Sequence, residues 1–195
     1  MSVAPATRIA VLASGAGSNL QVLIDELHGR EAIIAGVAGD VADAAALDRA
    51  RAAGIPVAAF PLDRFPSRRA RDEAMAAWIA GHGAGLVVCA GYMALLTRGF
   101  LERFPGAVVN LHPSLLPAFP GLGAIEQALA AGVAETGVTV HLVDEGLDTG
   151  PVLAQEAVAV RADDTCESLT GRIREVEHRL LPAVMRGLIA ERGDR

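Results

Sequence analysis

The 195-residue chain has only two cysteines, Cys89 and Cys166, and they lie far apart in the sequence. This spacing excludes a disulfide framework and a cysteine-based zinc site. Nor does any group of His, Asp or Glu have the spacing of metal ligands, so we expect the protein to bind no metal. A chain with so few cysteines is expected to be a reduced, cytoplasmic protein.

Positive charge is also scarce, because 17 Lys and Arg stand against 23 Asp and Glu, a formal net charge of −6. A surface that binds nucleic acid is usually basic, so the composition argues against a nucleic-acid partner. Any anion must be bound at a local site. With 52% hydrophobic residues the chain is too apolar to be disordered, and its length suits one domain over residues 1–195.

The sequence contains no evident targeting segment and no convincing membrane span. Residues 1–7 lack the basic cluster and apolar core of a secretory signal. Residues 74–97 carry no charged side chain and are long enough to cross a bilayer. Gly81, Gly83 and Gly85 interrupt this run, however, and favour a helix, a turn and a buried strand. We therefore expect no contact with a membrane.

Short apolar runs alternate with amphipathic segments through much of the chain. The apolar runs predict strands over residues 9–13, 33–39, 56–60, 86–90 and 107–111. The segments between them predict helices over residues 20–27, 43–53 and 67–79. This alternation is typical of an α/β fold, with a mostly parallel twisted sheet, helices on both faces and ligands at the carboxyl ends of the strands.

The last part of the chain has a different pattern. Residues 112–121 contain three prolines and predict an ordered, irregular segment, which in a compact domain is usually functional. Alternating side chains over 138–143 predict a strand with one face on the core and one on a polar group, paired with residues 152–160 as a hairpin. Residues 165–191 predict a helix interrupted near Pro182.

A glycine-rich segment follows the first predicted strand and consists of Gly15, Ala16, Gly17, Ser18 and Asn19. Free backbone N–H groups and the dipole of the following helix favour an anion there, and a phosphate fits well. Leu20 stands where a dinucleotide fingerprint has its third glycine. A tight strand-to-helix turn with a helix cap therefore explains the segment equally well.

Asn110 and His112 form the second candidate site. They are two positions apart on a predicted strand, and Pro113 keeps His112 extended, so both side chains should project to the same side. An amide donor beside an imidazole can stabilise an oxyanion and move a proton. The alternative is a buried pair that only satisfies the backbone of a loop.

Asp148 lies in the segment Asp144–Pro151, whose two glycines and terminal proline predict a fixed and unusual backbone. Its carboxylate could orient His112, raise the basicity of the imidazole or hold a water that relays protons. A solvated turn carboxylate is the alternative, and no spacing rule connects Asp148 with His112.

Taken together, the segments Asn110–Pro117, Phe119–Gly121 and Asp148–Pro151 resemble the folate-dependent formyltransferases. The resemblance extends from Ser14 to His178 and implies a Rossmann-like formyltransferase fold with a carboxyl-terminal hairpin and helix. It implies direct formyl transfer from 10-formyltetrahydrofolate to the amine of glycinamide ribonucleotide, through a tetrahedral intermediate. In such a fold the nucleotide would bind in about residues 8–105, whereas folate binding and catalysis would use about residues 106–195.

The resemblance also implies a role for each candidate residue. Asn110 and His112 would stabilise the oxyanion, while Asp148 would hold His112 and an ordered water. The glycine-rich segment would bind the ribose phosphate, with further contacts to the ribonucleotide from Pro113, Arg174 and Glu177. The folate would bind Arg68, Met93, Ala94, Leu95, Leu96, Leu101, Val143, Asp144 and Glu145. A cis peptide is expected between Leu116 and Pro117.

Two positions depart from the family pattern, and two others allow more than one interpretation. Ala94 stands where some members have Arg, and Gly123 lies in a stretch where many have His; either change could alter the affinity for folate. Arg68 either points toward the site or is a surface charge. His141 either lines the cleft or is a satisfied histidine of the sheet.

Three other functions fit parts of the sequence. A hydrolase of the same folate usually has an additional amino-terminal domain, and an enzyme that formylates initiator transfer RNA usually has a basic carboxyl-terminal domain; we identify neither here. A nucleotide-binding module without catalysis would explain the glycine-rich segment but not Asn110, His112 and Asp148 together. We expect small-molecule substrates and either a monomer or a homodimer.

Overall fold

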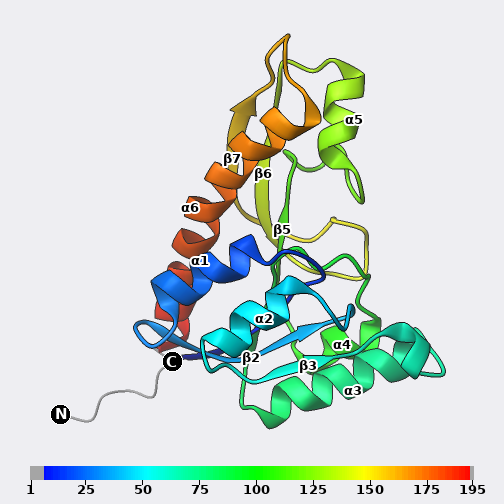
Figure 1. The fold of residues 1–195 in the computed structure, drawn as a ribbon, viewed down its shortest axis with the longest axis vertical. Coiled ribbons are helices and arrows are strands. Elements are labelled where there is room, and N and C mark those ends of the chain that lie inside the picture. Colours follow the sequence, from blue (N-terminus) through cyan, green and yellow to red (C-terminus); the bar gives the residue numbers. More distant parts are fainter. Residues whose placement is uncertain (1–6, 194–195) are drawn as a thin grey trace.

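The computed structural model describes residues 7–193 and contains one seven-stranded sheet (Figure 1). Residues 1–6, in which no secretory signal is predicted, lie outside the described residues. The order across the sheet is β3-β2-β1-β4-β5-β6-β7. In chain order the strands are β1 (Thr7–Leu12), β2 (Ala32–Gly39), β3 (Val57–Ala59), β4 (Leu86–Cys89), β5 (Val108–His112), β6 (Glu135–Leu142) and β7 (Val152–Ala159).

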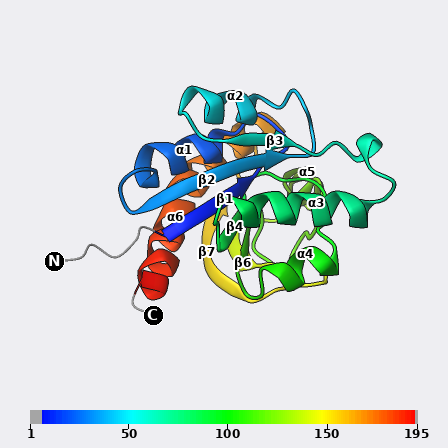
Figure 2. The same ribbon diagram turned by 90° about the horizontal axis from the view of Figure 1, so that it is seen from below.

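Helices cover both faces of this sheet (Figure 2). The α-helices are α1 (Ser18–Leu27), α2 (Ala45–Ala52), α3 (Arg68–Gly81), α4 (Arg98–Arg103), α5 (Ala124–Ala131) and α6 (Cys166–Gly193), and Leu62–Arg64 form a 3-10 turn, η1. Helices α1, α2 and α6 lie on one face, whereas α3 and α4 pack together on the other (Figure 2). The first five strands pair in parallel, while β6 and β7 are antiparallel to their neighbours. The predicted α/β fold and the predicted hairpin are thereby confirmed.

The centre of the sheet is built from residues that suit a strand buried on both faces. β4 has the sequence Leu-Val-Val-Cys, and all four residues are buried. On the α3 side, Trp78 packs directly against β2 at Gly36, where a Cβ atom would lie 2.6 Å from the indole ring. A side chain at position 36 would therefore separate the helix from the sheet.

The strand order changes direction at β1, because β2 and β3 are added on one side of β1 and β4 and β5 on the other. The segments that follow β1 and β4 consequently diverge, and ligands bind in α/β proteins at such a crevice. Here the two segments remain connected, because the Ser14 amide donates to the Gly91 carbonyl at 3.0 Å. The carboxyl end of β5 lies beside that of β4, so His112 belongs to the same edge of the sheet.

The prediction that the last helix breaks near Pro182 is wrong. Helix α6 has 28 residues and continues through Pro182 without a break. Proline removes one backbone donor and crowds the preceding turn, but Leu181 and Met185 beside it are 1% and 0% exposed. The apolar face of α6 packs on α1 and on the last two strands, and this burial outweighs the lost hydrogen bond.

Other differences from the predicted elements are smaller. The uncharged run at 74–97 contains the end of α3, a turn and β4, as predicted, and no helix within residues 7–193 is both long and apolar enough to span a membrane. The short elements α4, α5 and η1 were not predicted, because three to eight residues rarely establish a helical period. β6 is buried on both faces, since Thr139 and His141 are 0% and 1% exposed.

Candidate active site

The carboxylate of Asp148 is surrounded by polar groups from three segments of the chain. Its Oδ1 lies 3.4 Å from Asn110 Nδ2 and 3.6 Å from His141 Nε2. Its Oδ2 lies 3.4 Å from His112 Nδ1 and accepts the backbone N–H of Gly121 at 2.7 Å. The structure therefore brings together Asn110, His112 and Asp148, and adds His141 as a fourth member.

The sheet and one unusual turn create this arrangement. Asn110 and His112 lie two positions apart on β5, so their side chains project to the same face. Asn110 is paired with His141 of β6, and its Nδ2 lies 3.2 Å from His141 Nε2. Asp148 has a φ of 54°, which is rare for a residue with a side chain. The unusual backbone predicted for this loop is thus present, and it directs the carboxylate toward β5.

Both ring nitrogens of His112 face oxygen acceptors. Nε2 lies 2.8 Å from the backbone carbonyl oxygen of Phe119, and Nδ1 faces the Asp148 carboxylate. A carbonyl oxygen can only accept, so Nε2 carries a proton in this arrangement. Nδ1 lies 3.4 Å from Oδ2 of Asp148, and this carboxylate therefore helps to orient the imidazole ring.

The same contacts keep Asp148 ionised. Hydrogen bonding with His141, the N–H of Gly121 and the positive charge of His112 together lower the pKa of Asp148 to about 2, although partial burial opposes the shift. At neutral pH this carboxylate is a fixed negative charge. It can orient donors and stabilise a cation, but it holds no proton of its own.

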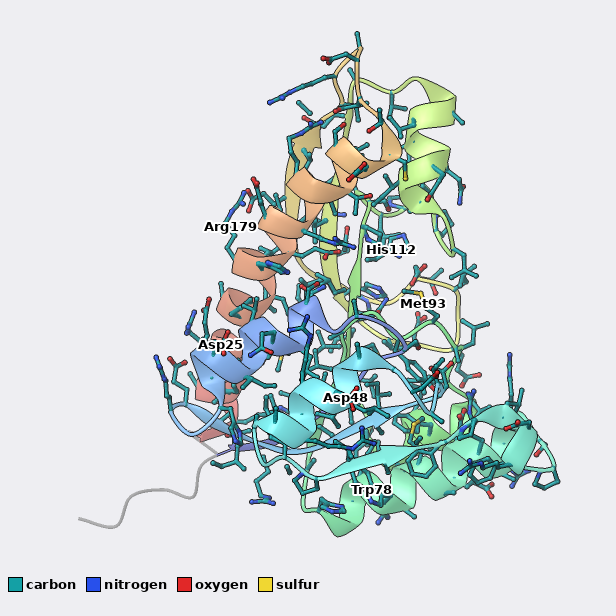
Figure 3. All side chains as sticks on the ribbon, viewed as in Figure 1. Asp25, Asp48, Trp78, Met93, His112 and Arg179 are labelled. Atoms are coloured by element: carbon teal, nitrogen blue, oxygen red, sulfur yellow. The ribbon has the colours of Figure 1, made fainter. Side chains whose placement is uncertain are left out.

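A cavity of about 680 Å³ opens beside this cluster. Its size is typical of a small-molecule site. Of the residues predicted to bind ligands, those that line it are Arg68, Met93, Ala94, Leu95, Leu96, Pro113, Val143 and Asp144. Leu101 packs against the core instead, and the exposed Glu145 lies 3.6 Å from Arg98. Figure 3 shows Met93 and His112 on the side of the sheet away from Arg179 of α6.

Several lining residues were missed by the sequence analysis. Exposed leucines surround the cavity at Leu62, Leu122 and Leu147, and polar residues line it at Asp40 and Arg71. Asp40 could have been found, because it directly follows β2, at the carboxyl edge where ligands bind. Arg71 gave no such signal, since a charged residue in a helix is normally exposed. Gly123 also lines the cavity and precedes α5 with a φ of 71°.

The glycine-rich segment contacts α2 and leads into α1. The carbonyl oxygens of Gly15 and Ala16 accept hydrogen bonds from the Ala46 amide and the Arg49 side chain, both in α2. Gly17 has a φ of 72°, and a Cβ there would lie 2.7 Å from Ala46. No side chain caps α1, so the first N–H groups of the helix stay available to a ligand.

Two of the other predicted ribonucleotide contacts, Glu177 and Arg174, lie near Asn19 of this segment, whereas Pro113 lines the cavity. Asn19 Nδ2 donates to Glu177 Oε2 at 2.9 Å and thereby joins α1 to α6. Burial raises the pKa of Glu177, while the Asn19 amide and the charge of Arg174 oppose that shift. These residues do not line the 680 Å³ cavity. Ser14 connects the two regions, because its hydroxyl donates to Asp40 and accepts the Met93 N–H, and both of those residues line the cavity.

Residues 7–185 match the protein family described as "Formyl transferase". The chain belongs to the formyl transferase family. The predicted resemblance is therefore confirmed, and so is the Rossmann-like fold that it implied. The cis peptide expected between Leu116 and Pro117 is also present.

Individual formyl transferases resemble the chain over nearly its whole length. It is 47% identical to a phosphoribosylglycinamide formyltransferase of Mycobacterium tuberculosis over 185 residues. This alignment covers 95% of this chain and 86% of that protein. It is 40% identical to the protein of the same name from Bacillus subtilis, over 93% of this chain and 94% of that one. The crystal structure of glycinamide ribonucleotide transformylase 1 from Symbiobacterium toebii superposes with a TM-score of 0.93, at 46% identity, over 96% and 89% of the two chains.

Proposed function

We propose that this formyl transferase moves the formyl group of 10-formyltetrahydrofolate to the amine of glycinamide ribonucleotide, a step of purine synthesis. The observation that carries the proposal is the meeting of Asn110, His112 and ionised Asp148 at the edge of one large cavity. The names of the most similar relatives support this pair of substrates. The apolar lining of the cavity suits the ring system of a folate.

The reaction begins with attack of the ribonucleotide amine on the formyl carbon. The C=O double bond opens and places a negative charge on the formyl oxygen. Nδ2 of Asn110 and Nε2 of His112 are the N–H donors that stabilise this charge. In the structure the Phe119 carbonyl accepts the Nε2 proton of His112, and we propose that the formyl oxygen replaces that carbonyl when substrate binds.

The tetrahedral adduct then breaks its bond to N10 of the folate. The attacking nitrogen loses a proton and N10 gains one, so the products are formylglycinamide ribonucleotide and tetrahydrofolate. Asp148 has a pKa of about 2 and has no proton to give at neutral pH. We therefore assign proton movement to His112 and a water held by the carboxylate, while Asp148 stabilises the imidazolium.

The ribonucleotide phosphate is assigned to the N–H groups at the start of α1. The carbonyl groups of Gly15 and Ala16 support this assignment, because they accept hydrogen bonds from α2. Their negative ends are therefore occupied, and the positive end of the α1 dipole can face the phosphate. Glu177 would accept the ribose hydroxyls, and Arg174 would add positive charge for the phosphate. The amine would then reach across Ser14 into the folate cavity.

The test is a transfer assay with purified protein, 10-formyltetrahydrofolate and glycinamide ribonucleotide, in which tetrahydrofolate formation is followed. His112→Ala and Asn110→Ala should each lower kcat by about 10²-fold or more, the usual effect of losing an oxyanion donor. His82→Ala removes an imidazole at the end of α3, outside the cavity, and should retain activity. Near-wild-type turnover in either of the first two variants would reject the assignment, as would release of formate without ribonucleotide.

A further inference from the structure

A second cavity lies at the edge of the sheet opposite to the candidate active site. Its volume of about 450 Å³ is within the usual range for a small-molecule site. Its walls come from the segments that enter β4 and β5, from the end of α4 and from the end of α6. Strands β1, β4 and β5 are parallel, so their amino ends meet here, whereas Asn110 and His112 lie toward the carboxyl end of β5. The two cavities share no residue of the described chain.

Three arginines meet at this second cavity. Arg103 of α4 and Arg192 of α6 line it. Arg8 of β1 borders it, because its Nε donates to the His82 carbonyl at 3.0 Å and would lie 3.2 Å from a Cβ at Gly83, which is a lining residue. Figure 2 shows the end of α6 beside the start of β1, and these two elements are in contact. Positive charges from three distant parts of the chain therefore converge on one edge of the sheet.

No carboxylate compensates these charges in the described part of the chain. Among residues 7–193, none of the three arginines has an Asp or Glu oxygen within 4.0 Å, and no residue that lines the cavity is acidic. Glu102 is next to Arg103 in the sequence, but its Oε1 lies 2.7 Å from Nε of Arg98. The chain as a whole has a net charge of −6, so this cluster of unpaired positive charge is exceptional. An anion in the cavity would relieve the repulsion between the arginines.

Arg192 is held in place while part of its guanidinium group stays available. Its Nη1 donates to the Gly85 carbonyl and its Nη2 to the Gly106 carbonyl, both at 3.3 Å. These contacts use only some of the N–H donors of an arginine, so others remain for a ligand. Little side-chain entropy is lost when a group oriented in this way binds. Arg103, in the last turn of α4, makes no side-chain hydrogen bond to any other described residue.

The rest of the lining decides which kind of anion fits. Apart from glycines, the other residues that line the cavity are all apolar: Ala80, Ala84, Phe104, Pro105 and Ala107. This wall suits a planar ring better than a bare inorganic ion. A phosphate monoester carries about two negative charges at neutral pH and matches a pair of guanidinium groups.

We propose that this cavity is a second binding site, which takes a nucleoside monophosphate. The phosphate binds Arg103 and Arg192, and the base lies against the apolar wall. Arg8 adds positive charge from β1 and strengthens the attraction for the phosphate. The site is at the opposite edge of the sheet from Asn110 and His112, so it does not depend on the proposed reaction.

The experiment measures by calorimetry how the complete protein binds adenosine monophosphate (AMP), with inorganic phosphate and adenosine as comparison ligands. AMP should bind more tightly than either of them. Arg103→Met and Arg192→Met should each weaken the binding of AMP by about tenfold or more, as expected when a charge-assisted hydrogen bond is lost. Arg179→Met is the matched control and should leave the affinity unchanged, because Arg179 is an exposed residue of α6 that is paired with Glu156 and lies outside the cavity lining.

A second measurement locates the bound nucleotide, because the glycine-rich segment is also proposed to bind a phosphate. In isotope-labelled Gly17→Val protein, AMP should still shift the NMR signals of the amide groups of Gly83, Gly85 and Gly106, which lie at the cavity. Binding that is abolished by Gly17→Val but retained in Arg103→Met would place the nucleotide at the start of α1 and overturn the proposal.

Arg103→Met keeps the test decisive if Arg192→Met loosens the end of α6. Arg192 holds two backbone carbonyl groups, whereas Arg103 holds none in the described structure, so Arg103→Met should leave Tm and formyl transfer unchanged. Absence of saturable binding up to about 1 mM AMP, or equal affinity of Arg103→Met and the wild type for AMP, would overturn the proposal. Equal affinity of the wild type for AMP and inorganic phosphate would overturn the assignment of a nucleotide.

Discussion

Asp148 illustrates, at the scale of the residue, how the fold changes the chemistry of an ordinary carboxylic acid. An Asp side chain in an unfolded chain titrates near pH 4, whereas contacts with His141, Gly121 and His112 lower the pKa of Asp148 to about 2. The proton is bound more weakly in the folded state than in the unfolded state. Folding is consequently favoured wherever Asp148 is ionised, and part of this stability disappears in acid.

We predict that Asp148→Asn removes a pH-dependent part of the stability. Above about pH 5, the wild type should exceed the variant in free energy of unfolding by a constant amount. This excess should decrease as the pH falls from about 4 toward about 2, because the wild-type carboxylate then becomes protonated. Urea denaturation of both proteins at a series of pH values measures the difference. A difference that does not vary with pH would contradict the lowered pKa.

At the scale of the element, the start of α1 depends on one backbone conformation. Gly17→Val places a branched side chain at a φ of 72° and within 2.7 Å of Ala46. The segment must move, so KM for glycinamide ribonucleotide should rise by about tenfold or more, while KM for the folate changes less. Steady-state kinetics with each substrate varied in turn measures the two effects.

The control for this change is available at the other end of the same helix. Gly29 also has a φ of 72°. A Cβ atom at this position would have no heavy atom within 4 Å, apart from those of the adjacent residues. Gly29→Ala should therefore cost some stability through backbone strain and leave both KM values unchanged. Equal increases of the two KM values in Gly17→Val would mean that the segment does not bind the phosphate.

β6 fixes the proline-rich segment through one buried hydroxyl. Thr139 Oγ1 donates to the Ser114 carbonyl at 2.7 Å and accepts the Leu116 N–H at 3.1 Å. Thr139→Val should lower the free energy of unfolding by about 2 kcal/mol, because these backbone groups lose their partner. Thr136 on the same strand has a buried hydroxyl without a partner among the described residues, so Thr136→Val should be neutral or stabilising. A loss of equal size in both variants would refute the explanation.

At the scale of the whole molecule, the groups proposed to act in catalysis come from several different strands and the segments that follow them. Asn110 and His112 lie on β5, Asp148 follows β6, and the glycine-rich segment follows β1. The carboxyl ends of β1 and β5 lie at one edge of the sheet, because the first five strands are parallel. β6 is antiparallel, so its carboxyl end lies at the opposite edge, and the loop that follows it brings Asp148 to Asn110 and His112. Within residues 7–193 there is no group of three His, Cys, Asp or Glu side chains arranged to hold a metal.

Treatment with a chelator is therefore predicted to leave the reaction unaffected. In the proposed mechanism, Asn110 and His112 supply the electrostatic stabilisation that a metal provides in other enzymes. Protein dialysed against EDTA should transfer the formyl group at the rate of untreated protein, and added Zn²⁺ or Mg²⁺ should not increase it. A loss of activity that is restored by one metal would contradict this mechanism.

Much of the architecture was accessible from the sequence, because it depends on local chemistry. Apolar runs such as Leu86–Cys89 have no stable place except inside a sheet, and Ser67 accepts the Ala70 N–H as a helix cap should. Asn110 and His112 were placed on one side of their strand by its two-residue period. The break at Pro182 was predicted wrongly, because burial of the surrounding helix face is a property of the whole fold.

The sequence by itself determined the alternation of the strands with the longer helices, the shared face of Asn110 and His112, and the glycine that α1 needs at its start. Only the tertiary structure decided that Asp148 meets His112, that His141 joins them, and that the charged Arg71 is buried in the cavity wall. The physical reason is the distance along the chain over which each kind of interaction acts. Backbone periodicity and turn preferences act over a few residues, whereas contacts between distant segments exist only after the sheet has brought the ends of its strands together.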